Sequence, residues 1–302
     1  VQSSDVLLQY GNTANTHDIV LKAEREWYDA AVRDALTQAG LGSDGYFQTS
    51  ANPQDRSISS GSAAPDTLRS ASALKNAVGL AITSRGSDLG RAHLQRRVHS
   101  LVIAATRTLR ASAERAKDLS QIRSFVARDI ASQACRRQLV VKAEPALQQR
   151  SISLLDPKSG EELAQTLDFS SALDLKPALT RSRPCGYWLS AHSTEAVQRL
   201  RQLGLQVMRV AEPGKLIADS YNDAKPIGAT ERGSLLLTRG AVEADEGSFY
   251  VSLNQSHANL AAAALEPDTP YSFAGTGVLA GLSDVARIVN PPSVVFEDDD
   301  AD

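Results

Sequence analysis

The chain has 302 residues and a mass of 32.2 kDa, enough to bury a hydrophobic core and, at the usual domain size, to form two structural units. Apolar residues make up 42% and charged residues 22% of it, and no uncharged apolar run approaches the roughly 20 residues that cross a bilayer. The composition therefore excludes global disorder and membrane spanning and predicts a soluble globular protein.

The first residues contain neither an initiating Met nor a basic stretch followed by an apolar segment. We therefore predict no signal peptide in this sequence, and expect the natural amino terminus to lie outside it. The sequence therefore does not indicate the cellular compartment of the protein.

The net charge of −3 is distributed unevenly. Residues 91–150 contain 13 basic and 4 acidic residues, whereas residues 151–302 contain 12 basic and 21 acidic residues. The two regions are expected to attract each other or to face different partners. The acidic end, residues 297–302, is interpreted as a solvated tail, because five carboxylates in six residues repel one another.

Residues 18–40 are predicted to form an amphipathic helix, with Val20 and Trp27 near helical spacing and Gly40 as the stop. The segment 42–72 is rich in Gly, Ser, Asn, Asp and Pro and has Tyr46 near its start. Such a composition predicts a long ordered loop of the kind that shapes a site.

Residues 77–82 are apolar on both faces, which predicts a strand buried inside a parallel sheet. The polar residues 83–86 would then lie at the carboxyl end of this strand, where ligands bind in open α/β sheets. A long helix is predicted over residues 91–117. One apolar stripe runs along that helix, formed by Leu94, Val98, Leu101, Val102, Ala105 and Leu109.

A second helix over residues 119–137 is expected to close the first half, and we place a domain boundary after it. The second half is predicted to be β-rich, because short apolar stretches alternate there with turn signals. The expected strands are 139–141, 151–155, 207–210, 234–237 and 248–251. Two helices, over 194–203 and 257–265, interrupt them.

Several stretches of the chain together carry a family resemblance. They are residues 6–13, 46–50, 65–70, 74–78 and 84–86 in the first half, and 183–184, 248–251, 254–255 and 265–270 in the second. In order and spacing the first half resembles zinc carboxypeptidases of the carboxypeptidase A type, specifically the carboxyl-terminal part of the catalytic domain of bacterial members. The second half is similar to the β-rich extension of those enzymes.

The resemblance implies a mechanism in which zinc, held by a His-x-x-Glu pair and a more distant His, polarises a peptide carbonyl and activates water. In the family a strand-end Glu in a Glu-Thr-Arg-Gly sequence shuttles the proton. The corresponding residues here begin with Thr83 and end with Gly86, so Thr83 occupies the position of the Glu. A threonine hydroxyl cannot act as this base, so the chemical step should lose most of the roughly 10²–10⁴-fold that general base catalysis contributes.

The family's zinc ligands lie upstream of the region that matches residues 6–13, so the resemblance transfers no metal site to this chain. Arg69 and Ser70 align with an Arg-Asn pair suited to gripping a substrate carboxylate. The Asn has become Ser70, and the Gly that precedes the pair has become Leu68. Arg69 either faces the substrate cleft, close to Tyr46, or is a surface arginine that caps a loop.

His192 and Glu195 have a His-x-x-Glu spacing of their own, and His257 lies 62 residues beyond His192. The simpler interpretation is a helix start, with Ser193 as the N-cap and Glu195 in the first turn. Cys135 and Cys185 can form at most one disulfide and no four-thiolate zinc site. No base is visible in sequence beside Cys185, so a catalytic thiol is not predicted.

The basic residues of the two predicted helices offer a different class of function, because they could track phosphates. They are Arg91, Arg96, Arg97, Arg107, Arg110, Arg115, Arg123, Arg128, Arg136 and Arg137. Their spacing distributes them over several helix faces, no aromatic residues interleave, and the acidic second half could neutralise them, so no nucleic-acid partner is predicted. No P-loop, dinucleotide fingerprint or serine nucleophile elbow is present.

The predicted fold class is α/β. Residues 1–137 would form part of a carboxypeptidase-like mixed sheet flanked by helices, and residues 138–302 a β-rich accessory domain. The expected function is that of a zinc-carboxypeptidase relative, without a zinc site or general base of its own and hence inactive as this chain. The family's partner is a peptide with a free carboxyl terminus.

The alternative is a non-catalytic module that binds a peptide or carboxylate near Arg69 and Tyr46. Either the sequence is a fragment of a longer enzyme, or it is a decayed relative. Half a sheet would leave an apolar edge uncovered, so the isolated chain should be marginally stable or should self-associate through that edge.

Overall fold

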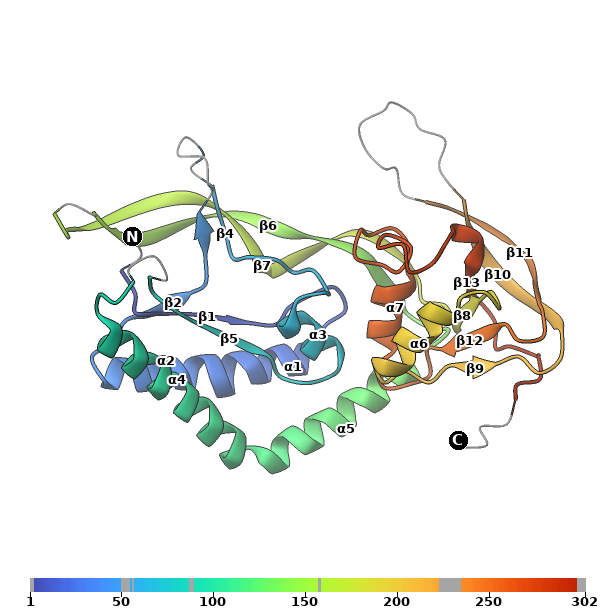
Figure 1. Ribbon diagram of the computed structural model, residues 1–302, viewed down its shortest axis with the longest axis horizontal. Helices are drawn as coiled ribbons and strands as arrows, with labels where there is room; N and C mark the ends of the chain where they lie inside the picture. The colour runs from blue at the N-terminus through green and yellow to red at the C-terminus, as the bar shows by residue number, and fades with distance from the viewer. Residues whose placement is uncertain are drawn as a thin grey trace. The chain divides into compact units, whose positions relative to one another are not determined.

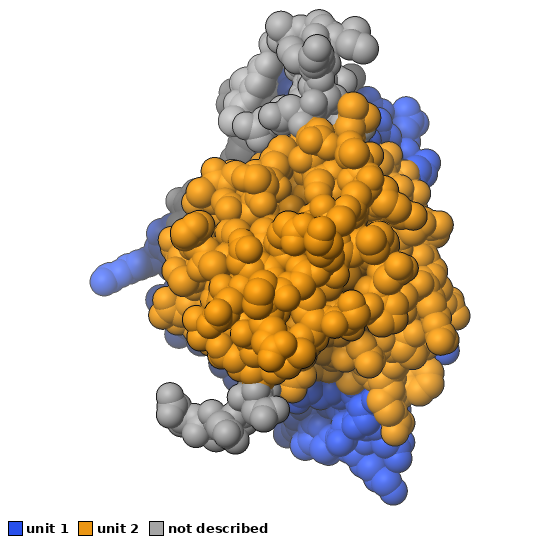
Figure 2. All heavy atoms as spheres, turned by 90° about the vertical axis from the view of Figure 1, so that its right-hand side faces the viewer, with its two compact units in different colours: residues 1–124, 143–176 blue, residues 125–142, 177–302 orange. Residues whose placement is uncertain are grey.

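The computed structural model describes residues 3–49, 55, 57–86, 90–156, 159–222 and 235–297 (Figure 1). Contacts divide the chain into unit 1, Val1–Ser124 with Ala143–Lys176, and unit 2, Phe125–Lys142 with Pro177–Asp302 (Figure 2). Residues 298–302 of the predicted acidic tail, residues 50–54 and 56 of the predicted loop, and residue 234 of a predicted strand lie outside the described residues.

Unit 1 contains a three-stranded mixed sheet in the order β2-β1-β5. The central strand β1 (Val6–Tyr10) pairs in parallel with β2 (Ser43–Gly45) and antiparallel with β5 (Leu80–Ser84). Helices cover one face of it, so unit 1 has the expected α/β character. The core between them is formed by Val6, Leu8, Val32, Leu36, Leu41 and Ala104.

The helix predicted over residues 18–40 begins at the expected residue but is not uniform. It consists of α1 (Asp18–Ala23), the π-helical segment η1 (Glu24–Asp29) and α2 (Ala30–Gln38). Gly40 follows with a φ of +69°, as expected of a glycine that ends a helix. The wider π-turn was not predicted, because a period-3.6 pattern does not distinguish it from a regular α-helix.

The prediction for residues 77–82 was wrong in two respects. Residues 77–79 precede β5, so Thr83 and Ser84 belong to the strand instead of following it. The strand is also antiparallel to β1 and only partly buried. Among the described residues β1 is its only strand neighbour, so its other edge carries no strand.

A second sheet in the order β3-β4-β7-β6 covers part of the segment that was predicted as a loop. Its strands are β3 (Gln48–Thr49), β4 (Ser57–Ser59), β6 (Gln138–Leu155) and β7 (Glu162–Ser182). Because β6 and β7 each contain residues of both units, the division by contacts does not coincide with a boundary after residue 137. The boundary between domains 1–137 and 138–302 stays a prediction.

Helices α3 (Leu68–Leu74), α4 (Leu94–Glu114) and α5 (Ala116–Ser132) complete the described helices that contain residues of unit 1. Helix α4 packs along α2 through small side chains, of which Ser100, Ala104 and Ala111 are buried. The predicted apolar stripe of α4 exists, but all of its residues are exposed. Val98 and Val102, for example, are 51% and 55% exposed.

Unit 2 is built on a six-stranded sheet in the order β11-β10-β13-β8-β12-β9, in which neighbouring strands are antiparallel. The strands are β8 (Gly186–Leu189), β9 (Met208–Arg209), β10 (Gly214–Asn222), β11 (Leu236–Ala244), β12 (Phe249–Ser252) and β13 (Val285–Ile288). Helices α6 (Thr194–Gln202) and α7 (Ala258–Leu265) and the 3₁₀ turn η3 (Leu282–Asp284) accompany them. The predicted β-rich second half is thus confirmed.

A buried network of charged side chains crosses unit 2. The Glu266 carboxylate accepts hydrogen bonds from Tyr187 Oη at 2.7 Å, from Arg287 Nε at 2.8 Å and from Arg181 Nη1 at 3.0 Å. Arg181 also forms a bidentate pair with Asp268. Arg287 is 2% and Glu266 3% exposed, so each of these buried charges is compensated by an opposite charge instead of by water.

Taken over the described part of the chain, no helix is both long enough and apolar enough to cross a membrane.

Candidate functional site

Thr83 lies on the face of the unit 1 sheet that is turned away from the helices. In β1 and β5 alternate side chains enter the core, among them Leu8 and Ile82. Thr83 pairs with Leu7 and has the opposite orientation, with its side chain exposed. The position that corresponds to the family's Glu therefore presents a hydroxyl to solvent.

Arg69 lies in the first turn of α3 and is partly buried. Its Nη2 donates a hydrogen bond to the Ser62 carbonyl at 2.7 Å, whereas its buried Nε has no partner among the described residues. Burial lowers the pKa of this guanidinium, and the neighbouring Tyr46 opposes that shift. The described protein groups thus satisfy the arginine only in part.

Gly61 is the point where three polar side chains come together. A Cβ built on Gly61 would lie 3.3 Å from Tyr46 Cε1, 3.4 Å from Gln9 Oε1 and 3.5 Å from Arg69 Nη2. Gly61 has a φ of +81°, which disfavours any other residue there. Tyr46 and Arg69, 23 positions apart in the sequence, are therefore close in space.

Gln9 belongs to this cluster and shares a sheet face with Thr83. Gln9 pairs with Ala81, so its side chain is on the same sheet face as that of Thr83, two residues further along β5. Diagonal neighbours of this kind are roughly 7–8 Å apart. The geometry supports a common polar surface that contains Thr83 and Arg69, but whether the two share one concavity stays a prediction.

The remaining predicted site residues have specific partners. Ser70 is fully buried, and its Oγ donates to the Asn12 carbonyl at 3.2 Å, while its backbone N–H donates to the capping Thr67 hydroxyl at 3.3 Å. The Tyr46 backbone N–H donates to the Leu8 carbonyl at 2.8 Å, and its hydroxyl accepts from Gln48. The contacts of Ser70 anchor α3, and those of Tyr46 hold its loop against β1.

Sequence reasoning missed Glu24, which is completely buried in η1. Its Oε1 accepts a hydrogen bond from the Gly79 N–H at 2.8 Å, and its Oε2 has no partner among the described residues. Removal from water raises the pKa of this carboxyl to about 8. Val20, Glu24 and Trp27 follow helical spacing, so an acid on an otherwise apolar stripe was the signal for this residue.

Glu24 lies at a tight junction of the backbone beside Arg69. A Cβ on Gly11 would lie only 2.3 Å from the Arg69 carbonyl oxygen, and one on Gly79 would lie 3.0 Å from Arg69 Cα. Because Glu24 holds the N–H of Gly79, it fixes the start of β5 against α3. Its role in this geometry is to position the strand that carries Thr83.

No group of three or more potential metal ligands comes together within the described ranges. His192 is exposed, Glu195 forms an ion pair with Arg199 at 2.7 Å, and the His257 ring contacts the Gly204 carbonyl. These residues by themselves do not fit the donor set of a zinc ion. Glu195 is in the first turn of α6 as expected, but Ser193 makes no side-chain capping bond and contacts Ser190 instead.

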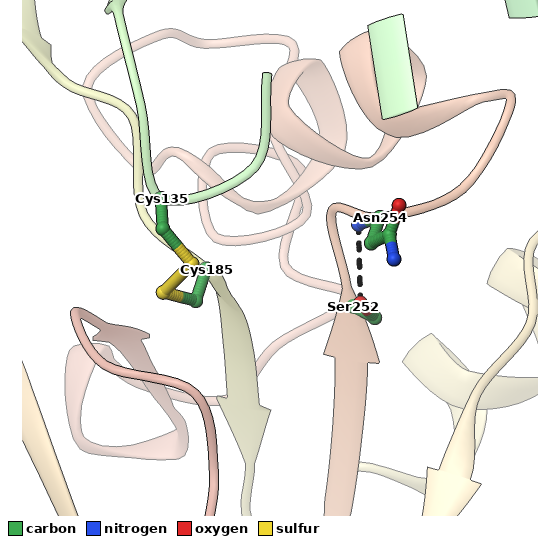
Figure 3. Close-up of a disulfide and its surroundings, with 4 residues drawn as sticks. All are labelled: Cys135, Cys185, Ser252 and Asn254. Atoms are coloured by element: carbon green, nitrogen blue, oxygen red, sulfur yellow. Dashed lines mark hydrogen bonds between the residues drawn. A yellow bond between two sulfur atoms is a disulfide. The ribbon is translucent and has the colours of Figure 1, made fainter. Parts of the chain in front are cut away.

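The two cysteines, Cys135 and Cys185, form a disulfide within unit 2 (Figure 3). Two basic side chains of α4 pair with acids of unit 1, Arg96 with Asp5 at 2.6 Å and Arg107 with Glu114 at 3.0 Å. The absence of a nucleic-acid partner stays a prediction.

Comparisons with known proteins support the carboxypeptidase class. The chain is 21% identical over 289 residues to carboxypeptidase 2 of Trichophyton rubrum, a match that covers 92% of this chain and 53% of that protein. It is 22% identical over 294 residues to carboxypeptidase 2 of Trichophyton equinum, again with 92% and 53% coverage. A third relative, carboxypeptidase 2 of Trichophyton tonsurans, is 23% identical over 220 residues.

At 21–23% identity, these similarities support at most a distant relation of the chain to carboxypeptidases. The chain spans about half the length of the curated relatives it matches. No family model matches the sequence, and no solved structure matches it.

Proposed function

We propose that the chain is a relative of the zinc metallocarboxypeptidases of the carboxypeptidase A type and that, as this 302-residue chain, it does not cleave peptides. The parent reaction would be zinc-dependent hydrolysis of carboxyl-terminal peptide bonds. The similarity to proteins named carboxypeptidase 2 supports the coarse class. The observation that carries the inactivity is the hydroxyl of Thr83, exposed where the resemblance places a carboxylate.

Hydrolysis of a peptide bond requires a group that takes a proton from the attacking water. A general base for water needs a pKa near the working pH, which a carboxylate in a cleft can reach and a threonine hydroxyl cannot. Near Thr83 the described structure offers Gln9, an amide, which cannot take up a proton at neutral pH either. The two buried carboxyls of this region are committed elsewhere, Glu24 to the Gly79 backbone and Asp5 to the Arg96 guanidinium.

A chromogenic carboxypeptidase substrate with and without a chelator tests the proposal. The unmodified chain should show no chelator-sensitive cleavage, and Thr83→Glu alone should not restore it, because the base would still have no metal-bound water to deprotonate. Thr83→Gln is the matched uncharged control. Chelator-sensitive cleavage by the unmodified chain would overturn the proposal.

A second candidate function is a non-catalytic module that binds the carboxylate of a peptide. The observation in its favour is the partly buried Arg69, whose Nε is unsatisfied within the described residues, next to Tyr46 and Gln9. Binding of an acetylated peptide at this surface should be lost on Arg69→Gln and retained on Arg25→Gln, an exposed arginine in η1. Equal binding by both variants would count against this function.

We further propose that the chain self-associates through unit 1. The free edge of β5 and the exposed apolar stripe of α4 (Leu94, Val98, Leu101, Val102, Ala105 and Leu109) belong to the same unit. An unpaired strand edge and a contiguous apolar surface both favour association.

A further inference from the structure

Unit 2 contains a cavity of about 440 Å³ beside the disulfide that Figure 3 shows. It lies between the end of α5, the turn that follows, the ends of β8 and β12, and a pair of prolines. The lining residues are Ala131, Ser132, Ala134, Cys135, Arg136, Cys185, Tyr250, Ser252, Asn254, Pro291 and Pro292. Its volume is within the range of pockets that hold small molecules.

Arg136 is the only charged residue among the described residues that line this cavity. Its side chain is exposed and forms no hydrogen bond or ion pair within the described part of the chain, although its backbone N–H donates to Gln133. The described lining residues include no carboxylate that would neutralise it. The pocket therefore has a net positive charge supplied by one uncommitted guanidinium.

Asn254 adds a second polar group to the same lining. Its backbone N–H donates to Ser252 Oγ at 3.1 Å, which fixes the turn after β12, while its side-chain amide is free of hydrogen bonds to the described residues (Figure 3). A guanidinium and an amide N–H are both donors, and together they match the oxygens of a carboxylate.

The rest of the lining is largely apolar and held in place. The Tyr250 ring lies against Gly186, where a Cβ would come within 2.5 Å of Tyr250 Cζ, so the glycine makes room for the ring. Burial raises the pKa of Tyr250 to about 12, so its phenol carries no negative charge at neutral pH. Pro291 and Pro292 provide rigid apolar surface, and the disulfide fixes the wall that carries Arg136.

We propose that this pocket binds a small carboxylate with an apolar body, of the class of an acylated apolar amino acid or the carboxyl end of a peptide. Arg136 would hold the carboxylate with Asn254 beside it, and the surfaces of Pro291 and Pro292 would contact the apolar part. The site goes beyond the function proposed for unit 1, because all of its residues belong to unit 2.

Calorimetric titration of the full chain with N-acetyl-leucine and with N-acetyl-leucinamide tests the proposal. The acid should bind saturably and the amide at least about tenfold more weakly, because charge-assisted hydrogen bonds are lost. N-acetylglycine should also bind more weakly, since it lacks the apolar side chain.

Arg136→Gln should reduce the affinity for N-acetyl-leucine at least about tenfold. Arg128→Gln is the matched control, because Arg128 is an exposed arginine of α5 that does not line the cavity. In an Arg69→Gln background the Arg136-dependent binding should persist, which separates this site from the carboxylate site considered in unit 1. Equal binding of acid and amide, unchanged binding by Arg136→Gln, or no saturable binding would each overturn the proposal.

Discussion

The two units of this chain stabilise their sheets in different ways. In unit 2 six antiparallel strands surround a core that contains Trp188 and Tyr250, and a disulfide and a buried ion network reinforce it. In unit 1 the mixed sheet has three described strands, and neither of its outer edges pairs with a further described strand. Helix α4 also exposes its apolar stripe. Unit 2 therefore buries its apolar side chains more completely than unit 1 does, although each unit has buried polar atoms without a partner among the described residues.

The residues that carry the family resemblance have different surroundings in the two units. The matching segments of unit 2 include Glu266 and Asp268, which compensate buried arginines, and Arg183, which donates to Asn259. These contacts give the matching residues of unit 2 a role in the stability of the fold. In unit 1 the matching segments include Arg69, whose Nε has no partner among the described residues, and they adjoin Thr83, whose side chain is exposed.

The chain offers a means to follow the two units separately. It has two tryptophans, Trp27 in unit 1 and Trp188 in unit 2. The variant Trp27→Phe retains Trp188, whose fluorescence should report urea unfolding of unit 2, and Trp188→Phe retains Trp27, which should report unfolding of unit 1. We expect unit 1 to unfold at the lower urea concentration.

The largest effect is expected for Glu266→Gln. The substitution leaves Arg287 and Arg181 without their shared carboxylate in a buried site, which should cost about 3–5 kcal/mol of unfolding free energy in unit 2. Urea unfolding followed by Trp188 fluorescence measures it. Glu195→Gln, which removes the exposed pair with Arg199, should cost under about 0.5 kcal/mol. Similar small losses in both variants would contradict the role given to the network.

Removal of the disulfide should have the next largest effect. Cys135 and Cys185 are separated by 50 residues, and loss of this cross-link should reduce the unfolding free energy of unit 2 by about 2–4 kcal/mol. The double variant Cys135→Ser/Cys185→Ser should shift the transition reported by Trp188. Reductant should produce the same shift in the unmodified chain and none in the variant; a reductant effect on the variant would show another cause.

Glu24 should make the stability of unit 1 depend on pH. Its pKa is raised from 4.5 to about 8 in the folded chain, so its contribution is complete below pH 4.5 and is lost as the pH rises toward 8. Between pH 6 and pH 8 this loss should amount to roughly 2 kcal/mol.

Glu24→Gln removes the titrating group and should flatten this dependence, as reported by Trp27. Glu26→Gln, at an exposed position of η1, is the control and should leave the slope unchanged. A wild-type slope in Glu24→Gln would show that another group is responsible.

The smallest effect on stability is expected on the apolar stripe of α4. Val98→Lys/Val102→Lys changes two exposed side chains, so the unfolding free energy should change little while self-association decreases. Sedimentation velocity over a concentration series measures the assembly. Gln95→Lys/Thr106→Lys adds the same charge at exposed polar positions of α4 and should have less effect. A monomeric unmodified chain at all concentrations would refute the association.

Local sequence patterns determined much of the fold. Hydrophobic spacing, turn residues and Gly40 located the main helices, and short apolar stretches identified the β-rich second half, because these signals act within a few residues of the chain. The same patterns placed Thr83 at the end of an apolar strand. They could not show that this strand is antiparallel, since strand direction depends on partners distant in sequence.

Tertiary structure alone decided the sites. The cluster of Tyr46, Gln9 and Arg69 depends on a close approach at Gly61, and the cavity at Arg136 depends on β8, β12 and a proline pair that lies 155 positions further along the chain. Long-range packing likewise buried Glu24, which raised its pKa, and left the apolar stripe of α4 exposed. Helical spacing alone places Glu24 and the α4 stripe each on an apolar helix face and does not distinguish the two cases. Sequence periodicity specifies which side chains share a face, whereas long-range packing specifies whether that face meets protein or water.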